Sequence, residues 1–260
     1  MTELALYQVD AFSGAVFGGN PAAVCPLDDW LPDETLQAIA RENNLSETAF
    51  FVPNGRGYHL RWFTPAFEVR LCGHATLASA FVITRLLKPE LDTVHFETAS
   101  GPLVVSRHGE AFTMDFPAQP PEPFKDGDAV FEILGFRPQA VLASEKMMAV
   151  LASEAEVREA EPHMERIKHL PIKGLILTAE GEGCDFVSRY FAPHAGIPED
   201  PVTGSAHCVL APYWAERLGK TVMEARQISA RGGRLTVEHR GERVLLTGKA
   251  ALYFEGRIRV

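Results

Sequence analysis

The chain has 260 residues, of which 46% are hydrophobic and 23% charged, and its net charge at neutral pH is -9. This composition is typical of a soluble globular protein, and the acidic excess argues against a nucleic-acid binder, which needs a basic face. No apolar run approaches the roughly 20 residues of a membrane helix, and the first residues lack the sections of a signal peptide. We therefore expect a cytoplasmic protein that acts on small molecules.

The first part of the chain predicts strands around one surface helix. Residues 31–44, LPDETLQAIARENN, place Leu36, Ile39, Ala40 and Asn43 at helical spacing and carry acids where the helix should begin. The segment ETAFFV, residues 47–52, predicts a strand, and residues 74–87 are apolar almost all round, which predicts an enclosed helix. Cys25 lies in an apolar run and is expected to pack in the core.

Two stretches of the chain share one plan, RWFTPAFEVRLCGHATLASAF at 61–81 and RYFAPHAGIPEDPVTGSAHCVLA at 189–211. The matched pairs, in chain order, are Arg61 with Arg189, Phe63 with Phe191, Pro65 with Pro193 and Gly73 with Gly204. The offset drifts from 189 - 61 = 128 to 204 - 73 = 131 across this stretch. Residues 101–110 then match residues 233–242 in the same order. This colinear match predicts a duplicated unit.

Prolines mark the boundary between the two copies. Residues 117–128 hold a cluster of prolines, which exclude a helix or a central strand and predict a crossover. We expect an α+β fold with two pseudo-repeated lobes, residues 1–116 and 129–249, each a curled, mostly antiparallel, barrel-like sheet around a central buried helix. Pro212 should kink the second buried helix or mark its start. Residues 250–260 predict a last strand, whose lobe the sequence leaves open.

Both buried helices are predicted to begin at a glycine, Gly73 or Gly204. A helix start presents unpaired N–H groups and a partial positive charge, so the two starts, if they face one cleft, would bind a small carboxylate. The simpler interpretation is that each glycine only permits a tight turn. Their equal repeat positions, each beside polar residues, favour the anion site.

Glu47 opens a strand that is otherwise apolar. Such an acid is either a solvated strand end or, in a dry cleft, a carboxyl group whose pKa is raised toward that of a proton-transfer catalyst.

With these residues identified, the chain resembles the phenazine-biosynthesis isomerase family, within the diaminopimelate-epimerase-like fold. The resemblance is nearly full length. It depends on four motifs in the family's order and spacing: VDAFSGAVFGGNPAAV, NLSETAFF, RWFTPAFEVRLCGHATLAS and EDPVTGSAHC. The resemblance implies two similar lobes, a homodimer, and isomerisation of a small cyclic amino or hydroxy carboxylic acid without cofactor or metal.

The resemblance also assigns roles to residues. Glu47 is expected to carry the proton as general acid and base, and His74 and Asp200 to position the substrate. Further residues that the resemblance places at the substrate are Ser46, Gly73, Thr203, Gly204 and Ser205, with Asn20 and Cys72 as additional candidates.

One departure leaves an alternative open. Related amino-acid epimerases use two thiols, one before the glycine of each helix start, whereas this chain has Cys72 before Gly73 but Thr203 before Gly204. A two-thiol mechanism is therefore excluded. Cys72 is either inert packing or one half of a mixed pair with Asp200 or Glu47, which would make the protein an epimerase or racemase.

Two further alternatives belong to other classes. A non-catalytic binding protein of the same fold would keep the site without turnover. A metal site from Cys72, His74, His207 and Cys208 is disfavoured because no standard zinc spacing is present. A nucleotide enzyme is disfavoured by the lack of a G-x-G-x-x-G or P-loop motif.

Overall fold

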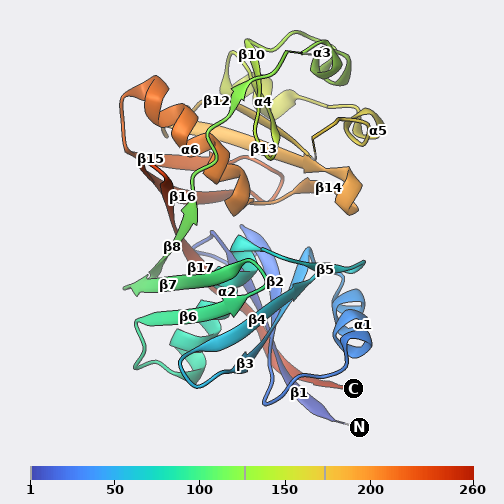
Figure 1. The fold of residues 1–260 in the computed structure, drawn as a ribbon, viewed down its shortest axis with the longest axis vertical. Coiled ribbons are helices and arrows are strands. Elements are labelled where there is room, and N and C mark those ends of the chain that lie inside the picture. The colour runs from blue at the N-terminus through green and yellow to red at the C-terminus, as the bar shows by residue number, and fades with distance from the viewer. Residues whose placement is uncertain (1, 126, 173) are drawn as a thin grey trace. The chain divides into compact units, whose positions relative to one another are not determined.

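The computed structural model describes residues 2–125, 127–172 and 174–260 (Figure 1). The chain divides into two compact units, one made of residues 1–115 and 247–260 and the other of residues 116–246. The closing strand, whose lobe the sequence left open, thus belongs to the first unit.

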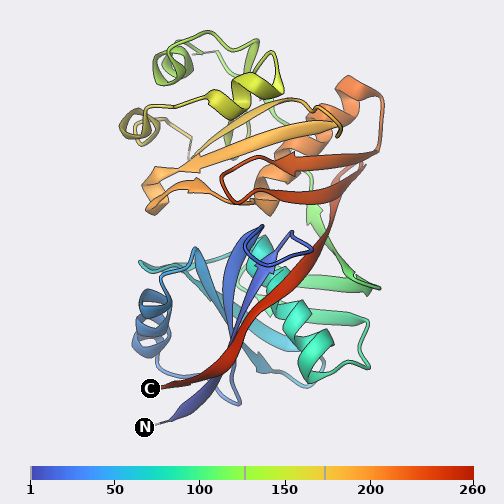
Figure 2. The same ribbon diagram turned by 180° about the vertical axis from the view of Figure 1, so that it is seen from behind.

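The first unit is a closed ring of strands with two helices. Its elements are β1 (Glu3–Ala11), β2 (Asn20–Pro26), α1 (Asp33–Asn43), β3 (Glu47–Pro53), β4 (Tyr58–Phe63), β5 (Glu68–Val69), α2 (Gly73–Val82) with a π-helical turn (Ile83–Leu87), β6 (Thr93–Thr98), β7 (Gly101–His108), β8 (Ala111–Pro117) and the latter part of β17 (Arg243–Arg259). The ring runs β1, β2, β3, β4, β6, β7, β8, β17 and back to β1. The β2–β3 and β4–β6 pairs are parallel, and β1–β2, β3–β4, β6–β7, β7–β8 and β1–β17 are antiparallel. Figure 2 shows β17, in red, alongside β1, in blue.

Helix α2 is the enclosed helix that the apolar run predicts. It packs against β1, β2, β3 and β7, and nearly all its residues are buried. Its buried hydroxyls each donate to the carbonyl four residues earlier: Thr76 to Cys72, Ser79 to Ala75 and, in the turn that follows, Thr84 to Ala80. The helix therefore buries polar side chains without leaving a donor unsatisfied.

Helix α1 covers the other face of the same strands. Leu36, Ile39 and Ala40, the residues predicted from helical spacing, are its buried face. They share a core cluster with Cys25 and Phe50, so Cys25 is core packing as predicted.

The second unit repeats this plan. Its elements are β9 (Glu122–Pro123), α3 (Asp128–Leu134), β10 (Ala140–Ala143), β11 (Met147–Val150), α4 (Glu154–Glu159), α5 (Met164–Ile167), β12 (Leu175–Glu180), β13 (Phe186–Ala192), a short 3-10 turn (Pro193–Ala195), β14 (Ile197–Asp200), α6 (Gly204–Leu218), β15 (Val222–Gln227), β16 (Gly233–Arg240) and the start of β17. Its parallel pairs are β11–β12 and β13–β15, the counterparts of β2–β3 and β4–β6. The predicted α+β class with two curled, mostly antiparallel sheets is confirmed.

Helix α6 starts at Gly204 as predicted but runs through Pro212. The expectation that Pro212 marks the start of this helix is wrong. Proline has no N–H, so the carbonyl of Cys208 loses its helical donor. The backbone N–H of Gln119, from the proline-rich crossover, donates to that carbonyl instead, at 3.0 Å. A contact distant in sequence thus satisfies the group that Pro212 leaves open.

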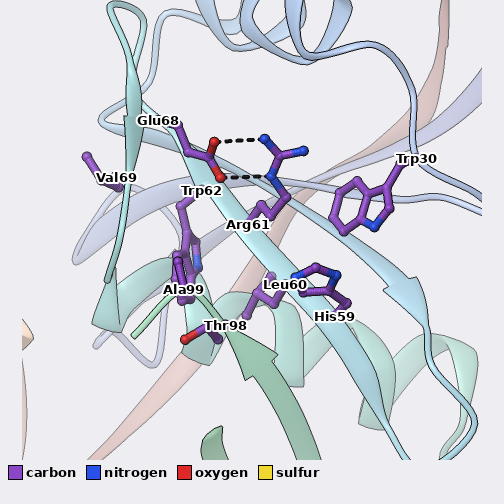
Figure 3. A pocket seen from close by; sticks show the side chains of 9 residues that line it. All are labelled: Trp30, His59, Leu60, Arg61, Trp62, Glu68, Val69, Thr98 and Ala99. Atoms are coloured by element: carbon purple, nitrogen blue, oxygen red, sulfur yellow. Dashed lines mark hydrogen bonds and ion pairs between the residues drawn. The ribbon is translucent and has the colours of Figure 1, made fainter. Parts of the chain in front are cut away.

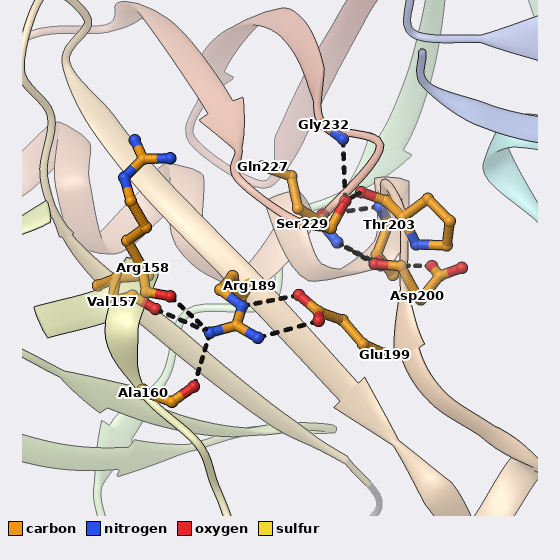
Figure 4. A network of polar contacts seen from close by, with 11 residues as sticks. Val157, Arg158, Ala160, Arg189, Glu199, Asp200, Thr203, Gln227, Ser229 and Gly232 are labelled. Atoms are coloured by element: carbon orange, nitrogen blue, oxygen red, sulfur yellow. Dashed lines mark hydrogen bonds and ion pairs between the residues drawn. The ribbon is translucent and has the colours of Figure 1, made fainter. Parts of the chain in front are cut away.

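The repeated arginines brace the same turn in each unit. Arg61 binds both carboxylate oxygens of Glu68 at 2.7 Å (Figure 3), and Arg189 binds both oxygens of Glu199 at 2.7 and 3.0 Å (Figure 4). Each guanidinium also lies over the phenylalanine two residues later, Phe63 or Phe191. These bidentate pairs are the strong form of the ion pair and fix the loop that leads to each buried helix.

Two further observations concern the cysteines and the helices. All four cysteines are free thiols. In the described parts of the chain, no helix combines the length and the apolar composition needed to cross a membrane.

Candidate active site

Glu47 and His74 meet inside the first unit. Glu47 is the first residue of β3 and His74 the second residue of α2, and His74 Nε2 lies 3.2 Å from Glu47 Oε2. The side chains are 14% and 5% exposed, so water screens this pair little. The two residues that the sequence assigned to proton transfer and positioning are therefore in contact.

Asn20 fixes the protonation of His74. The amide nitrogen of Asn20, the first residue of β2, lies 3.1 Å from His74 Nδ1. An amide N–H donates, so Nδ1 accepts and the ring proton lies on Nε2, which faces Glu47 Oε2 at 3.2 Å. Burial lowers the pKa of His74 to about 3. The imidazole is thus neutral at neutral pH and orients the carboxylate.

Cys72 lies on the other side of the imidazole. It precedes α2 with extended backbone, and its Sγ is 3.5 Å from His74 Nδ1. Ligand atoms of Glu47, Cys72 and His74 lie within 4.8 Å of one another. Cys72 Sγ also lies 4.0 Å from His74 Nε2, the nitrogen that faces Glu47, whereas Nδ1 faces Asn20.

The start of α2 is open to an anion. Its cap residue makes no side-chain hydrogen bond to the first turn, and the first turn holds no acid. Gly73, the first helical residue, is half-buried, as is Ser46 in the turn before β3. The partial positive charge of this helix end therefore lies beside Glu47 and His74.

A different polar network precedes α6 in the second unit (Figure 4). Thr203 donates its hydroxyl to Asp200 Oδ2 at 2.5 Å. The side chain of Gln227 accepts from the backbone N–H of Thr203 at 2.8 Å and donates to the carbonyl of Asp200 at 2.7 Å. All three residues are buried. The turn before α6 is thereby locked by side chains from two elements.

This network leaves the start of α6 without a cap. A threonine before a helix normally caps it, but the hydroxyl of Thr203 is turned to Asp200 and makes no cap hydrogen bond. The first turn again contains no acid. Gly204 is buried and Ser205 half-buried at this helix start. The second unit thus also presents a positive helix end without a carboxylate in its first turn.

The structure gathers the predicted residues into two groups. Asn20, Glu47, Cys72, Gly73 and His74 lie together in the first unit, with Ser46 adjacent in the chain to Glu47, and Asp200, Thr203, Gly204 and Ser205 lie together in the second. The shared cleft stays a prediction.

His207 and Cys208, which were considered as metal ligands from the sequence, are core residues of the second unit. His207 donates through Nδ1 to the carbonyl of Thr203 at 2.9 Å, and burial lowers its pKa to about 4. Burial raises the pKa of the neighbouring Cys208 thiol to about 12. Gln227, by contrast, was missed by the sequence analysis, because a single glutamine at a strand end belongs to no motif.

Comparisons with known proteins point to one family. The family model described as phenazine biosynthesis-like protein matches residues 9–256. A protein named uncharacterized isomerase from Pseudomonas aeruginosa is 53% identical, over 98% of this chain and 99% of its own.

Solved structures repeat the fold. A phenazine biosynthesis protein of the PhzF family from Enterococcus faecalis is 45% identical, with a TM-score of 0.97 and all of both chains covered. A hydroxyproline epimerase from Agrobacterium vitis has a TM-score of 0.60 at 11% identity, over 98% of this chain and 92% of its own. The epimerase shares the fold alone.

Proposed function

Because the chain belongs to the phenazine biosynthesis-like protein family, we propose that it is an isomerase that moves a proton between carbon atoms of a small carboxylic acid, with Glu47 as the proton carrier. Relatives named isomerases support the reaction class. The observation that carries the finer proposal is the buried contact between Glu47 and a neutral His74 beside an open helix start.

The chemistry requires one group that works in both directions. As a carboxylate, Glu47 removes a proton from one carbon, and as the acid it returns a proton to another carbon on the same face of the substrate. The N–H of His74 holds the carboxylate in one orientation through both steps. No electrons are transferred to or from the substrate, so the scheme needs no redox cofactor.

The helix starts are the proposed binding groups for the carboxylate of the substrate. A substrate carboxylate would accept from N–H groups at a helix start, and neither α2 nor α6 is capped by its own side chain. Asp200, held by Thr203 and Gln227, is a fixed acceptor for a substrate hydroxyl or amino group. Negative charge that develops on the substrate when the proton leaves would be stabilised by the same N–H groups.

A second candidate is an epimerase that uses Cys72. It is favoured by one observation, the 3.5 Å contact between Cys72 Sγ and the imidazole of His74, which places a thiol beside the proposed proton carrier.

One experiment separates the two candidates. The purified protein is incubated in heavy water with a panel of cyclic unsaturated hydroxy and amino acids and with proline-like amino acids, and proton NMR follows isomerisation and carbon deuteration. We expect isomerisation of a cyclic acid by wild type and Cys72→Ala, and none by Glu47→Gln. Loss of turnover in Cys72→Ala with activity kept in Glu47→Gln would assign the reaction to the epimerase. Binding of panel acids without any turnover by wild type would support the non-catalytic alternative.

We also propose that the protein forms a homodimer and lies in the cytoplasm. Sedimentation at several protein concentrations would test the first.

A further inference from the structure

Lys146 is a buried cation that the proposed reaction does not use. It directly precedes β11 and is only 9% exposed. Its ammonium lies over the ring of Tyr190, whose centroid is 5.9 Å from Nζ. Within residues 2–125, 127–172 and 174–260, Nζ makes no hydrogen bond. A buried ammonium normally has a hydrogen-bond acceptor.

The register of the strands shows which residue of the second unit corresponds to Glu47. In the first unit Phe63 pairs with Thr48, and in the second unit its repeat partner Phe191 pairs with Leu175. Thr48 and Leu175 therefore occupy equivalent positions. The residue before each is Glu47 in the first unit and Gly174 in the second. The second unit thus has a glycine where the first has its proposed proton carrier.

Tyr190 and Lys146 occupy the surroundings of that glycine. A Cβ added to Gly174 would lie 2.3 Å from the hydroxyl of Tyr190, so the phenol takes the space of a side chain there. Met147 pairs with Leu175 in the parallel β11–β12 ladder, which places Lys146 beside Gly174. The second unit thus has an amine next to the position at which the first unit has a carboxylate.

Acidic groups lie near Lys146. Asp200 and Glu145 are within electrostatic range of the ammonium, and burial lowers the pKa of Lys146. Tyr190, over whose ring the ammonium lies, pairs with Asp200, the last residue before the turn that leads into α6. A carboxylate bound at the start of α6 would be repelled by Asp200, and a nearby cation offsets this repulsion.

We propose that Lys146 is a ligand-binding residue whose ammonium pairs with a carboxylate held at the start of α6. The proposal rests on the proposed function in one respect, that the ligand is a small carboxylic acid. It deepens that function by making the charge of the acid, not only its oxygen atoms, a requirement for binding. Esters and amides of the same acid should therefore bind poorly. Tyr190, packed over Gly174 and against the amine, holds the ammonium in place.

Binding of a simple probe tests this without knowledge of the substrate. Benzoate and its neutral isostere benzamide are titrated by calorimetry into wild type, Lys146→Met and the exposed-lysine control Lys168→Met. We expect benzoate to bind Lys146→Met at least about tenfold more weakly than wild type, since a charge-assisted hydrogen bond is lost. Benzamide affinity should be the same in all three proteins. The methionine keeps the length and packing of the lysine stem, and circular dichroism confirms folding.

A second readout separates ligand pairing from a structural role. In protein labelled with carbon-13 at the lysine ε-carbon, the signal lost in Lys146→Met is that of Lys146, and saturation with benzoate should raise its pKa by about 1 unit or more. Equal benzoate affinity in wild type and Lys146→Met, or a Lys146 signal that does not respond to benzoate, overturns the proposal. Benzoate binding involves no proton transfer to carbon, so failure of the proton-transfer mechanism would leave this result unchanged, and the two failures are distinguishable.

Discussion

The turn before α2 and the turn before α6 are built on one frame and carry different chemistry. Each is braced by a bidentate arginine and leads into a buried helix at a glycine. In the first unit the helix start meets a carboxylate and a neutral imidazole, whereas the second has glycine and serine at the two equivalent positions. The two copies share the arginine and glycine residues that set the backbone geometry, and they differ in the ionisable side chains at the helix start.

The difference assigns the units separate roles. The first contains a line of polar contacts from Asn20 through His74 to Glu47, which suits a group that takes and returns a proton. The second contains a locked turn around Asp200 and a buried cation at Lys146, which suits binding of a charged ligand.

The largest expected effect concerns the proton carrier. Glu47→Gln keeps the shape of the side chain but cannot exchange a proton, so we expect turnover to fall by about 10² to 10⁴. Cys72→Ala, at the residue before the same helix, should stay within about threefold of wild type. Initial rates on the acid identified by deuterium exchange measure both. Comparable losses in the two variants would mean that the thiol shares the chemistry.

Acid should destabilise both units through one buried histidine each. Burial lowers the pKa of His74 to about 3 and of His207 to about 4, whereas an unfolded histidine titrates near about 6.5. As the pH falls below about 6.5 the unfolded chain therefore binds more protons, and stability is lost. Between about pH 7 and pH 5 the free energy of unfolding should fall by about 4 kcal/mol, about 2 from each histidine.

Urea unfolding across this pH range measures the effect. His74→Gln and His207→Gln should each remove about half of the pH dependence. A pH dependence that survives both buried substitutions would contradict the assignment.

Substitution of Gly174, the residue that corresponds to Glu47, tests whether Tyr190 fills the space of a side chain at this position. Gly174 has φ +78, and a Cβ there would meet Tyr190, so Gly174→Ala should cost about 3 kcal/mol from backbone strain and overpacking. Gly183 has φ +79 with nothing near its missing Cβ, so Gly183→Ala should cost only about 1 kcal/mol. Urea unfolding compares them. In a Tyr190→Ala background the two costs should become equal, and a difference that persists would show that Tyr190 does not fill this space.

The smallest expected effect is the loss of the hydrogen bonds that join Thr203 to Asp200 and Gln227 in the turn before α6. Thr203→Val removes the hydroxyl that bonds Asp200 and Gln227, and should lower the free energy of unfolding by about 1.5 kcal/mol. Ser205→Ala, at the half-buried second residue of the helix, should change it by less than about 0.5 kcal/mol. Thermal unfolding of both variants provides the comparison, and a Thr203→Val protein as stable as Ser205→Ala would rule these hydrogen bonds out as a source of stability.

The sequence predicted those features that leave a local or repeated pattern. Helix α1 follows from the spacing of its apolar residues, and the starts of α2 and α6 from a glycine at one repeat position. Glu47 and His74 were found because each lies in a motif, although nothing in either motif states that they touch.

The remaining features depend on contacts between distant segments. Pro212 predicted an interruption of α6, and the helix continues because Gln119 supplies the missing donor. Lys146 and Gln227 are single polar residues beside apolar strands, with no spacing that marks them. The correspondence of Gly174 with Glu47 becomes visible only from strand register.

The central claim, that the first unit moves the proton and the second binds the charged group, is tested most directly by steady-state kinetics of Glu47→Gln and Lys146→Met on the same acid. We expect Glu47→Gln to lose kcat by at least about a hundredfold, and Lys146→Met to raise KM at least about tenfold with kcat within about threefold of wild type. If Lys146→Met loses kcat while KM is unchanged, or Glu47→Gln raises KM while kcat is retained, the proposed division of roles is wrong.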